Sequence, residues 1–334
     1  MSEVQTERAS HCPACGASRS RVWASAQDRL YHTTSQVFEY SRCEACQSLF
    51  QSLRPVESQV GRCYPDQYGP YASVRPKART YLPRIANKAA NHLSERWLGV
   101  RGFRKSLAQV DAQLKPGAAV LDFGCGAGKY LDHARQRGCR TIGMDFSEQA
   151  LREVASRGHR ALPVSDDSWA ALGADAITLV RMNHVIEHLY RPAEVLRQIL
   201  GVMAPGGVLH LSTPNPSGVS AAKFADAWWG LECPRHIVLM PPAQARALLE
   251  QAGFTDVTVL HEPIVKDLVR SWAYRRVDAG LMPNEQVEGL VDDGLLNLRF
   301  TSAVRAWQKE HQATDRYHII ARKPRADRPT QEHS

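Results

Sequence analysis

The chain has 334 residues, of which 43% are apolar and 23% charged, a composition typical of a folded globular protein and not of a collagen-like, disordered or coiled-coil chain. No apolar run approaches the roughly 18 residues of a membrane-spanning helix, and the N-terminus lacks the apolar segment of a secretory signal, so we expect a cytoplasmic protein without a membrane span. The net charge of +8 lies entirely in residues 1–115, which hold 17 basic and 9 acidic residues. This distribution indicates either an anionic partner, such as a nucleotide, a phosphate-bearing carrier or nucleic acid, or a solvated helical face.

Two cysteine pairs form the first motif along the chain. Cys12 and Cys15, and then Cys43 and Cys46, each have C-x-x-C spacing, with 27 residues between the pairs. Each such turn directs two thiolates to one point, so two turns form the four-sulfur shell that zinc prefers. Because this shell has no open position, we expect a structural zinc in a small zinc-ribbon-like module over residues 1–65. The alternative is a redox dithiol, which needs only one pair.

Residues 66–116 are predicted to form a basic helical connector. Between Arg75 and Lys105 there are nine basic residues and a single acid, Glu95. Apolar residues recur at helical spacing through Ile85, Ala89, Leu93 and Trp97, which predicts a helix. Pro116 and Gly117 end this helical region.

After Gly117 the pattern changes to strands that alternate with helices. Short apolar runs predict strands at 118–123, 140–145, 160–164, 176–180, 208–212 and 257–260, with a late strand at 316–323. Such alternation predicts parallel βαβ units and a doubly wound α/β sheet. Residues 263–315 are predicted to be a helical insertion, and the polar tail 324–334 to be disordered.

A glycine loop follows the first of these strands. Gly124, Gly126 and Gly128 have G-x-G-x-G spacing, and Asp122 precedes them by two residues. A carboxylate beside the loop would repel a pyrophosphate and favour a ligand that carries an ammonium or sulfonium. Asp145 ends the next strand and is placed to accept hydrogen bonds from both ribose hydroxyls of an adenosine. The alternative interpretation of the loop alone is a tight turn.

These segments resemble the S-adenosylmethionine-dependent methyltransferases of the seven-stranded fold. The segments 182–189, 204–207, 234–236 and 248–254 resemble the small-molecule branch of that family, which includes ubiquinone-type and sugar methyltransferases. The four-cysteine module resembles an N-terminal extension found in part of that branch. The resemblance implies a core over residues 117–262 with strand order 3-2-1-4-5-7-6 and an antiparallel last strand.

The resemblance also implies S-adenosylmethionine as the cofactor, together with a set of binding residues. Asp122 and the glycine loop would cradle the methionine part, Asp145 the ribose and Phe146 the adenine ring. Three more positions follow from the same motifs: Asp166 at the adenine amino group, and Met182 and Asn183 under the sulfonium.

Histidines supply the candidate catalytic groups. His236 lies within residues 214–240, which we expect to form a substrate lid, and His184 follows the fourth strand of the core. Either histidine could remove a proton from the methyl acceptor, and a structural role is the alternative for both. His184, Glu187 and His188 share one face of a helical turn. Some relatives bind magnesium at this place through acids and a histidine. The H-x-x-E-H sequence of these residues also matches an inverted zinc-protease motif. The third alternative is that Glu187 and His188 only brace the loop through hydrogen bonds.

We therefore expect an enzyme that methylates an oxygen or carbon of a small-molecule acceptor, such as a quinone, a sugar or a secondary metabolite, in anionic or carrier-bound form among others. The first alternative is an RNA methyltransferase that uses the zinc ribbon and the basic N-terminal third, although nucleic acid is not favoured as a partner. The second is a non-catalytic binding protein that keeps the fold. The sequence does not define the oligomeric state.

Overall fold

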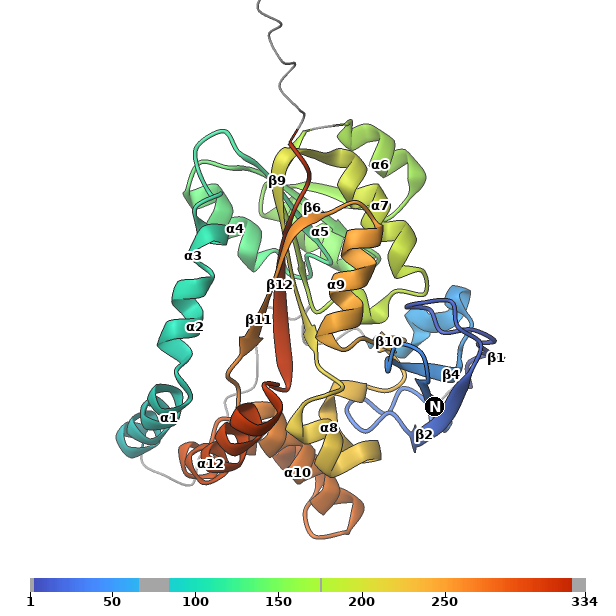
Figure 1. Ribbon diagram of the computed structural model, residues 1–334, viewed down its shortest axis with the longest axis vertical. Coiled ribbons are helices and arrows are strands. Elements are labelled where there is room, and N and C mark those ends of the chain that lie inside the picture. Colours follow the sequence, from blue (N-terminus) through green and yellow to red (C-terminus); the bar gives the residue numbers. More distant parts are fainter. Residues whose placement is uncertain (1–2, 66–83, 175, 326–334) are drawn as a thin grey trace, which may run out of the picture.

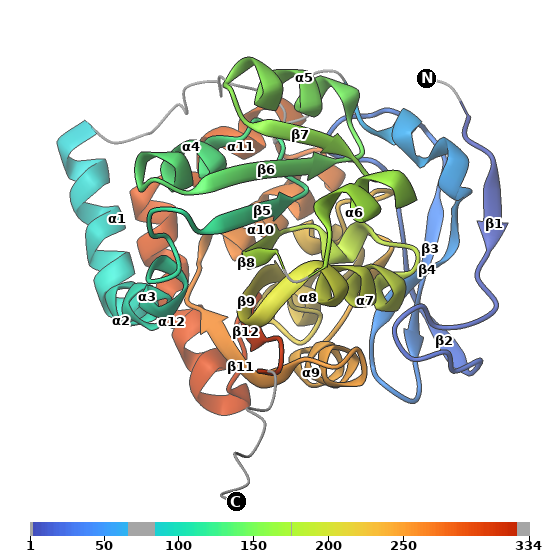
Figure 2. The same ribbon diagram turned by 90° about the horizontal axis from the view of Figure 1, so that it is seen from above.

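The computed structural model describes residues 3–65, 84–174 and 176–325. Two β-sheets lie side by side, the larger one sandwiched between helices and the smaller one built mainly from the N-terminal residues (Figures 1 and 2). Parts of the expected connector (66–83) and tail (326–334) lie outside the described residues.

The larger sheet contains seven strands: β5 (Ala119–Phe123), β6 (Arg140–Asp145), β7 (Arg160–Pro163), β8 (Ile177–Asn183), β9 (Met203–Pro214), β11 (Thr255–Glu262) and β12 (Arg316–Arg322). Across the sheet they lie in the order β7-β6-β5-β8-β9-β12-β11. Counted along the chain from β5, this order reads 3-2-1-4-5-7-6. β12 runs antiparallel to both of its neighbours, and the other pairings in this sheet are parallel.

Strand β9 differs from its expected span of 208–212, because it begins at Met203 and ends at Pro214. Its extra residues pair with the neighbouring strands: Met203 lies opposite Ile177, and Pro214 lies opposite Arg316. Backbone hydrogen bonding to the neighbouring strands thus sets the ends of β9, and the pattern of apolar residues in the sequence does not show where that bonding stops.

Helices cover both faces of this sheet, as the alternation of side chains along β5 requires. Leu121 and Phe123 belong to one hydrophobic core, and Val120 belongs to another on the opposite face. The covering helices are α4 (Lys129–Gln136), α5 (Glu148–Ser156), α6 (Asp166–Leu172), α7 (Pro192–Val202) and α9 (Pro242–Gln251). Because β5, β6 and β8 are parallel neighbours, their carboxyl ends lie together at one edge of the sheet. Ligands bind at this edge in doubly wound folds.

The N-terminal module is an antiparallel sheet. It contains β1 (Thr6–Arg8), β2 (Ser20–Ala26), β3 (Phe38–Cys43) and β4 (Leu49–Pro55), in the order β1-β4-β3-β2, followed by the 3-10 helix η1 (Glu57–Cys63). A fifth strand, β10 (Val238–Leu239), comes from the segment between β9 and α9 and pairs antiparallel with β4. The module is therefore joined to the core by backbone hydrogen bonds.

Residues 214–240, which we expected to form a substrate lid, are mostly interior. This stretch contains α8 (Val219–Phe224), η3 (Ala225–Ala227) and η4 (Trp229–Leu231). The side chains of Asn215, Trp228, Arg235 and His236 are all at most 2% exposed. The N-terminal module packs over this segment and makes it a bridge between the two sheets, and its expected role as a substrate lid stays a prediction.

The remaining helices lie along one side and at the lower end of the molecule in Figure 1. Three helices precede β5 in the chain: α1 (Arg84–Leu98), α2 (Val100–Ser106) and α3 (Ala108–Asp111). Residues 263–315, between β11 and β12, form α10 (Lys266–Asp278), η5 (Asn284–Gln286), α11 (Val287–Val291) and α12 (Gly294–His311). Helix α1 packs along α12. Among the helices of the described residues, none combines the length and apolar character needed to cross a bilayer.

Candidate active site and cysteine cluster

The glycine loop connects the end of β5 to the start of α4. Gly124, Gly126 and Gly128 have φ values of 76°, 50° and 73°, in the left-handed region that favours glycine. A Cβ atom at Gly124 would also overlap the side chain of Val185, which follows β8. The loop therefore needs glycine both for its backbone conformation and for its close approach to the β8 loop.

Asp122 lies beneath this loop and is bound to a protein cation. Its side chain is 1% exposed and its Oδ1 lies 3.1 Å from Nη1 of Arg181, on β8. Burial raises the pKa of Asp122 to about 6, although the positive charge of Arg181 opposes the shift. Arg181 also lies over the ring of Tyr130, 4.4 Å from its centroid. The sequence analysis missed Arg181; the available signal was a charged residue inside an otherwise apolar strand.

Asp145 ends β6 next to the loop. Its carboxylate accepts hydrogen bonds from the backbone N–H groups of Gly126 (3.0 Å) and Ser147 (2.9 Å). Burial raises the pKa of this carboxyl group. Two carboxylate oxygens offer about four acceptor positions, so these two bonds leave capacity for the hydroxyls of a ribose.

The other positions expected to bind the cofactor differ in exposure. Phe146 is 65% exposed, and its ring lies edge-on to Phe123 with centroids 6.2 Å apart. Asp166 is exposed in the first turn of α6. Met182 is fully buried in the core, and half-buried Asn183 accepts a hydrogen bond from Ser212 Oγ at 2.7 Å. The structure thus places an open aromatic surface beside Asp145 and a packed floor at the end of β8.

Glu187 is the centre of a polar cluster just after β8. Its side chain is fully buried, and its carboxylate lies 3.0 Å from Nδ1 of His184 and accepts a 3.0 Å hydrogen bond from Thr213. Burial raises the pKa of Glu187, but the hydrogen bond from His184 and then the electrostatic influence of the nearby histidines lower it to about 2. An ionised carboxylate only accepts hydrogen bonds, so Nδ1 of His184 is the donor and Nε2 is left free of the Glu187 bond.

His184 is partly exposed at the outer side of this cluster. Its side chain is 25% exposed, its ring lies edge-on to Trp229, and its Nε2 lies 3.5 Å from Nη1 of Arg316. The guanidinium groups of Arg270 and Arg316 both lie over the Trp229 ring, 4.7 and 4.8 Å from its centroid. The sequence analysis missed these two arginines, which come from the C-terminal part of the chain.

His236 lies behind Glu187, in the interior. It is 1% exposed, and its Nδ1 lies 2.7 Å from the carbonyl oxygen of Gly230, so Nδ1 carries the proton of that bond. Its Nε2 then faces two carboxylates, Glu232 at 3.7 Å and Glu187 at 4.0 Å. The structure therefore brings both candidate bases to the same carboxylate oxygen, and of the two only His184 is partly exposed.

His188 also braces the loop. Its Nδ1 lies 3.0 Å from the carbonyl oxygen of Arg235 and 2.9 Å from the hydroxyl of Tyr64. Burial, with the nearby His236, lowers the pKa of His188 to about 4, so its ring is neutral at neutral pH. Glu187, His188 and His236 have donor atoms within 4.8 Å of one another, a spacing that a metal ion could bridge, whereas His184 is not part of that set.

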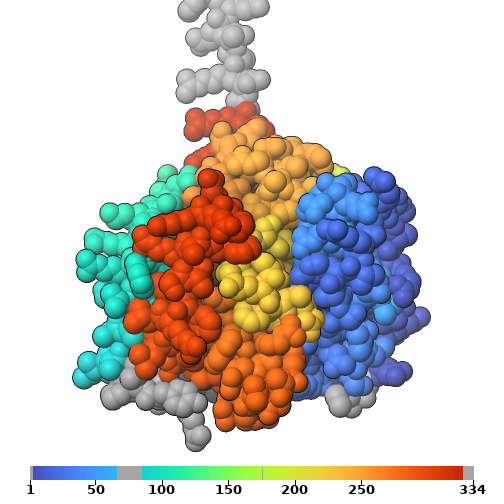
Figure 3. Space-filling model, turned by 60° about the horizontal axis from the view of Figure 1, so that its bottom comes forward, coloured from blue at the N-terminus to red at the C-terminus, as the bar shows by residue number. Residues whose placement is uncertain are grey.

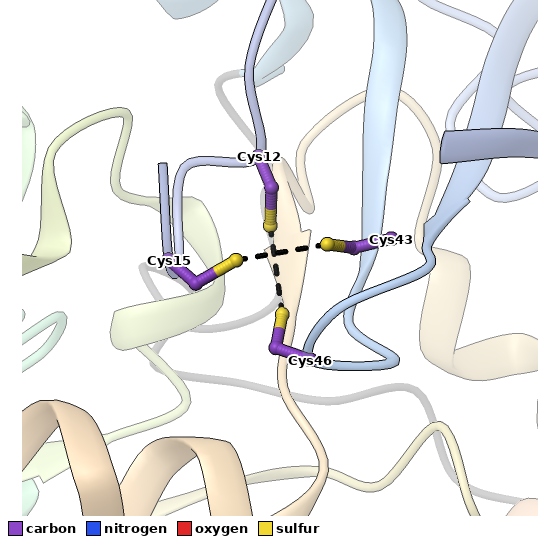
Figure 4. A group of neighbouring side chains, drawn as sticks. All are labelled: Cys12, Cys15, Cys43 and Cys46. Atoms are coloured by element: carbon purple, nitrogen blue, oxygen red, sulfur yellow. Dashed lines mark hydrogen bonds between the residues drawn. The ribbon is translucent and has the colours of Figure 1, made fainter. Parts of the chain in front are cut away.

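The four cysteines of the N-terminal module converge on one point (Figure 4). The Sγ atoms of Cys12 and Cys46 lie 3.7 Å apart, and those of Cys15 and Cys43 lie 3.6 Å apart. A tetrahedral zinc with bonds of about 2.3 Å to sulfur has its sulfur atoms about 3.8 Å apart, so the geometry fits zinc.

Each cysteine pair is held by a tight turn. Gly16 donates its backbone N–H to the carbonyl of Cys12 (2.8 Å), and Gln47 donates to that of Cys43 (3.0 Å). Both residues have positive φ, 75° and 62°. The two turns thus have matching geometry, although glycine occurs at only one of them.

Comparison with known proteins identifies the class of this fold and site. Residues 93–259, half of the chain, match the family described as "Methyltransferase domain", and the chain belongs to that family. It is an S-adenosylmethionine-dependent methyltransferase.

Relatives share part of its length. The chain is 29% identical over 201 residues to a "Ubiquinone biosynthesis O-methyltransferase" of Xanthomonas axonopodis, covering 51% of this chain and 82% of that protein. It is 34% identical over 140 residues to a "Probable S-adenosylmethionine-dependent methyltransferase" of Mycolicibacterium smegmatis, covering 41% of this chain and 52% of that protein. Among solved structures, a SAM-dependent methyltransferase from Archaeoglobus fulgidus matches with a TM-score of 0.44 and 22% identity, over 69% of this chain and 98% of that one.

Proposed function

We propose that this methyltransferase transfers the methyl group to an oxygen or carbon atom of a small-molecule acceptor, with His184 as the base. The observation that carries the proposal is the hydrogen bond between Nδ1 of His184 and the buried, ionised Glu187. This bond orients the ring and leaves Nε2 on the side of Arg316, whose Nη1 lies 3.5 Å away, with Trp229 edge-on to the ring. The acceptor is a quinone, a sugar or a secondary metabolite in this proposal. Relatives named as ubiquinone O-methyltransferases support a quinone-type acceptor.

The chemistry requires removal of a proton from the acceptor. When bound, S-adenosylmethionine supplies a methyl group on a sulfonium, and its sulfur leaves with the bonding electron pair as the acceptor attacks. A neutral His184 takes the acceptor proton on Nε2, where the acceptor hydroxyl replaces the Arg316 contact, and becomes an imidazolium that the negative charge of Glu187 stabilises. His236, behind the same carboxylate, positions Glu187 in this proposal and does not itself take the proton.

The cofactor residues follow the same edge of the sheet. We assign the methionine part to Asp122 and the glycine loop, the ribose to Asp145 and the adenine to Phe146. Exposure of the Phe146 ring next to a carboxylate with free acceptor capacity supports the last two assignments. Asp166, Met182 and Asn183 complete the set as expected from the sequence.

We also propose that Cys12, Cys15, Cys43 and Cys46 hold a structural zinc. The spacing of the sulfur atoms supports this role, and four thiolate ligands leave no coordination position for substrate. The metal would then fix the N-terminal module, which packs on the segment that carries His236.

The test is transfer of a radiolabelled methyl group to a panel of acceptors: a dihydroxy aromatic acid, a nucleotide-linked sugar and total RNA. We expect label in a small molecule, and His184→Ala should lower the rate by about 10²–10⁴-fold while the affinity for S-adenosylhomocysteine is retained. His188→Gln is the matched control and should keep most of the rate.

Other outcomes would redirect the proposal. Label found only in RNA would replace the small-molecule acceptor with the RNA alternative, and absence of cofactor binding would indicate a non-catalytic protein. Wild-type rates in both His184→Ala and His236→Ala would show that neither histidine is the base.

A further inference from the structure

Helix α1 buries its polar face and exposes its apolar one. Ser94, 2% exposed, lies 2.6 Å from Thr301 Oγ1 of α12, and the side-chain amide of Asn91 donates to the carbonyl of Asp292 at 3.2 Å. The carbonyl oxygen of the Asn87 side chain accepts a 2.6 Å bond from the backbone of Gly294. Polar contacts therefore make up most of the packing of α1 on its neighbours, with Leu98 at its end as the one large apolar side chain that it buries among the described residues, whereas a surface helix ordinarily packs through its apolar stripe.

The apolar stripe predicted from the sequence faces outward instead. Ile85 is 86% exposed, Leu93 51% and Trp97 49%, and the small side chain of Ala89 is also exposed. These residues recur at intervals of four, so they form one continuous strip along the helix. α1 lies at the outer edge of the molecule (Figure 2). Three large apolar side chains on one exposed face, including a tryptophan, are typical of a surface that binds a partner.

The charge around this strip indicates which partner. Lys88 and Arg96 are exposed on α1, and three more exposed basic residues follow on α2: Arg101, Arg104 and Lys105. Glu95, the single acid on these two helices, lies 3.7 Å from Arg104. α1 to α3 form one flank of the surface beside the C-terminal helices (teal in Figure 3). A second copy of the chain would bring two such basic faces together, which is unfavourable, whereas an anionic surface complements them.

We propose that α1, with the basic residues of α2, docks on an anionic membrane surface. The helix would lie in the plane of the interface, with Leu93 and Trp97 at the boundary of the acyl chains and Lys88 and Arg96 among the phosphate headgroups. Apolar contact plus attraction of basic side chains to anionic lipid is the usual basis of such binding, and tryptophan favours this depth. The proposal does not depend on the identity of the methyl acceptor.

The test is sedimentation of the full chain with vesicles of phosphatidylcholine alone, or with about 30% phosphatidylglycerol added to make the surface anionic. We expect binding to the anionic vesicles, weaker binding to the neutral ones, and release by salt. The double variant Leu93→Ser, Trp97→Ser should lower the partition coefficient by at least about tenfold. Leu281→Ser, which changes a 62% exposed leucine outside α1, is the matched control and should bind as the wild type does.

Two results would overturn the proposal. One is equal binding of the double variant and the wild type, or failure of the wild type to bind anionic vesicles. The other is a wild-type dimer, seen by sedimentation velocity, that the double variant converts to a monomer; the strip would then be an interface between copies. Because the substituted side chains are exposed, both variants should keep their affinity for S-adenosylhomocysteine, and this measurement checks that they fold.

Discussion

Asp28 and Arg235 form an ion pair that is completely shielded from solvent. The two nitrogens Nη1 and Nη2 of Arg235 donate to the two carboxylate oxygens of Asp28 at 3.1 and 2.9 Å, and both side chains are 0% exposed. Asp28 belongs to the N-terminal module, whereas Arg235 immediately precedes His236. The Tyr40 hydroxyl adds a second link, since it lies 3.0 Å from the carbonyl oxygen of Leu231 and 3.1 Å from that of His236 and can donate to either. The position of the His236 segment therefore depends on the N-terminal module.

Removal of one partner of this buried pair should be costly. Asp28→Ala removes the fully buried partner of Arg235 and leaves it only Glu232, whose Oε1 lies 3.2 Å from Nε, so we expect a loss of about 3–5 kcal/mol in the free energy of unfolding, measured by urea denaturation. Glu57→Ala breaks an exposed pair with Arg191, 2.8 Å in length, and serves as the control, with an expected loss below about 1 kcal/mol. Equal losses in the two variants would contradict the assignment of Asp28–Arg235 as the main link.

Asp122 should make the protein less stable as the pH rises. Burial raises its pKa to about 6, above the value of about 3.9 expected in the unfolded chain. Between these two values the folded state holds a proton that the unfolded state has lost, so the free energy of unfolding falls with increasing pH, by up to roughly 3 kcal/mol.

The Asp122→Asn variant isolates this effect. The difference in unfolding free energy between wild type and variant should decrease from pH 4 to pH 7, and should be constant below the unfolded pKa of about 3.9. A difference that does not change with pH would show that Asp122 titrates as an ordinary carboxyl group.

Asp145 should contribute to cofactor affinity. Loss of charge-assisted hydrogen bonds to the ribose should cost roughly 2–4 kcal/mol in binding of S-adenosylhomocysteine, measured by calorimetry on Asp145→Ala. Glu148→Ala removes an exposed carboxylate three residues away and should bind like the wild type. If both variants bind with wild-type affinity, the ribose lies elsewhere.

The cysteine cluster should hold about one zinc per chain, as determined by elemental analysis. The double variant Cys12→Ser, Cys46→Ser should lose this metal. The N-terminal module should then unfold, because the free energy of metal binding contributes to folding and the ligands Cys12 and Cys43 are buried in the hydrophobic core. Cys139→Ser, at a buried cysteine outside the cluster, should keep the metal. Purified wild-type protein without zinc would contradict the proposal.

Features that depend on nearby residues were predictable from the sequence. The alternation of strands and helices after Gly117 indicated the doubly wound sheet, because each βαβ unit is local in the chain. The paired cysteines indicated a metal-binding geometry, since C-x-x-C turns are formed by four consecutive residues. The glycine loop was identifiable for the same reason.

Features set by distant contacts were not predictable. β10 has two residues, too few for a periodic pattern, and exists because β4 lies beside it. The burial of His236 depends on Tyr40, almost two hundred residues earlier in the chain. The pattern of α1 predicted a helix but not which face packs, because the polar partners of Asn87 and Ser94 come from residues beyond 290.

The pairing of β4 with β10 means that the two halves of the chain share one sheet. Cleavage of the backbone between residues 65 and 84 would leave fragments that remain associated and elute together from a sizing column, held by the β4–β10 ladder and the shielded Asp28–Arg235 pair. Each half expressed alone would lack part of this shared sheet and expose the strand edge that its partner covers, a surface prone to aggregation. The N-terminal module thus behaves like a tightly bound subunit that happens to be covalently linked to the core.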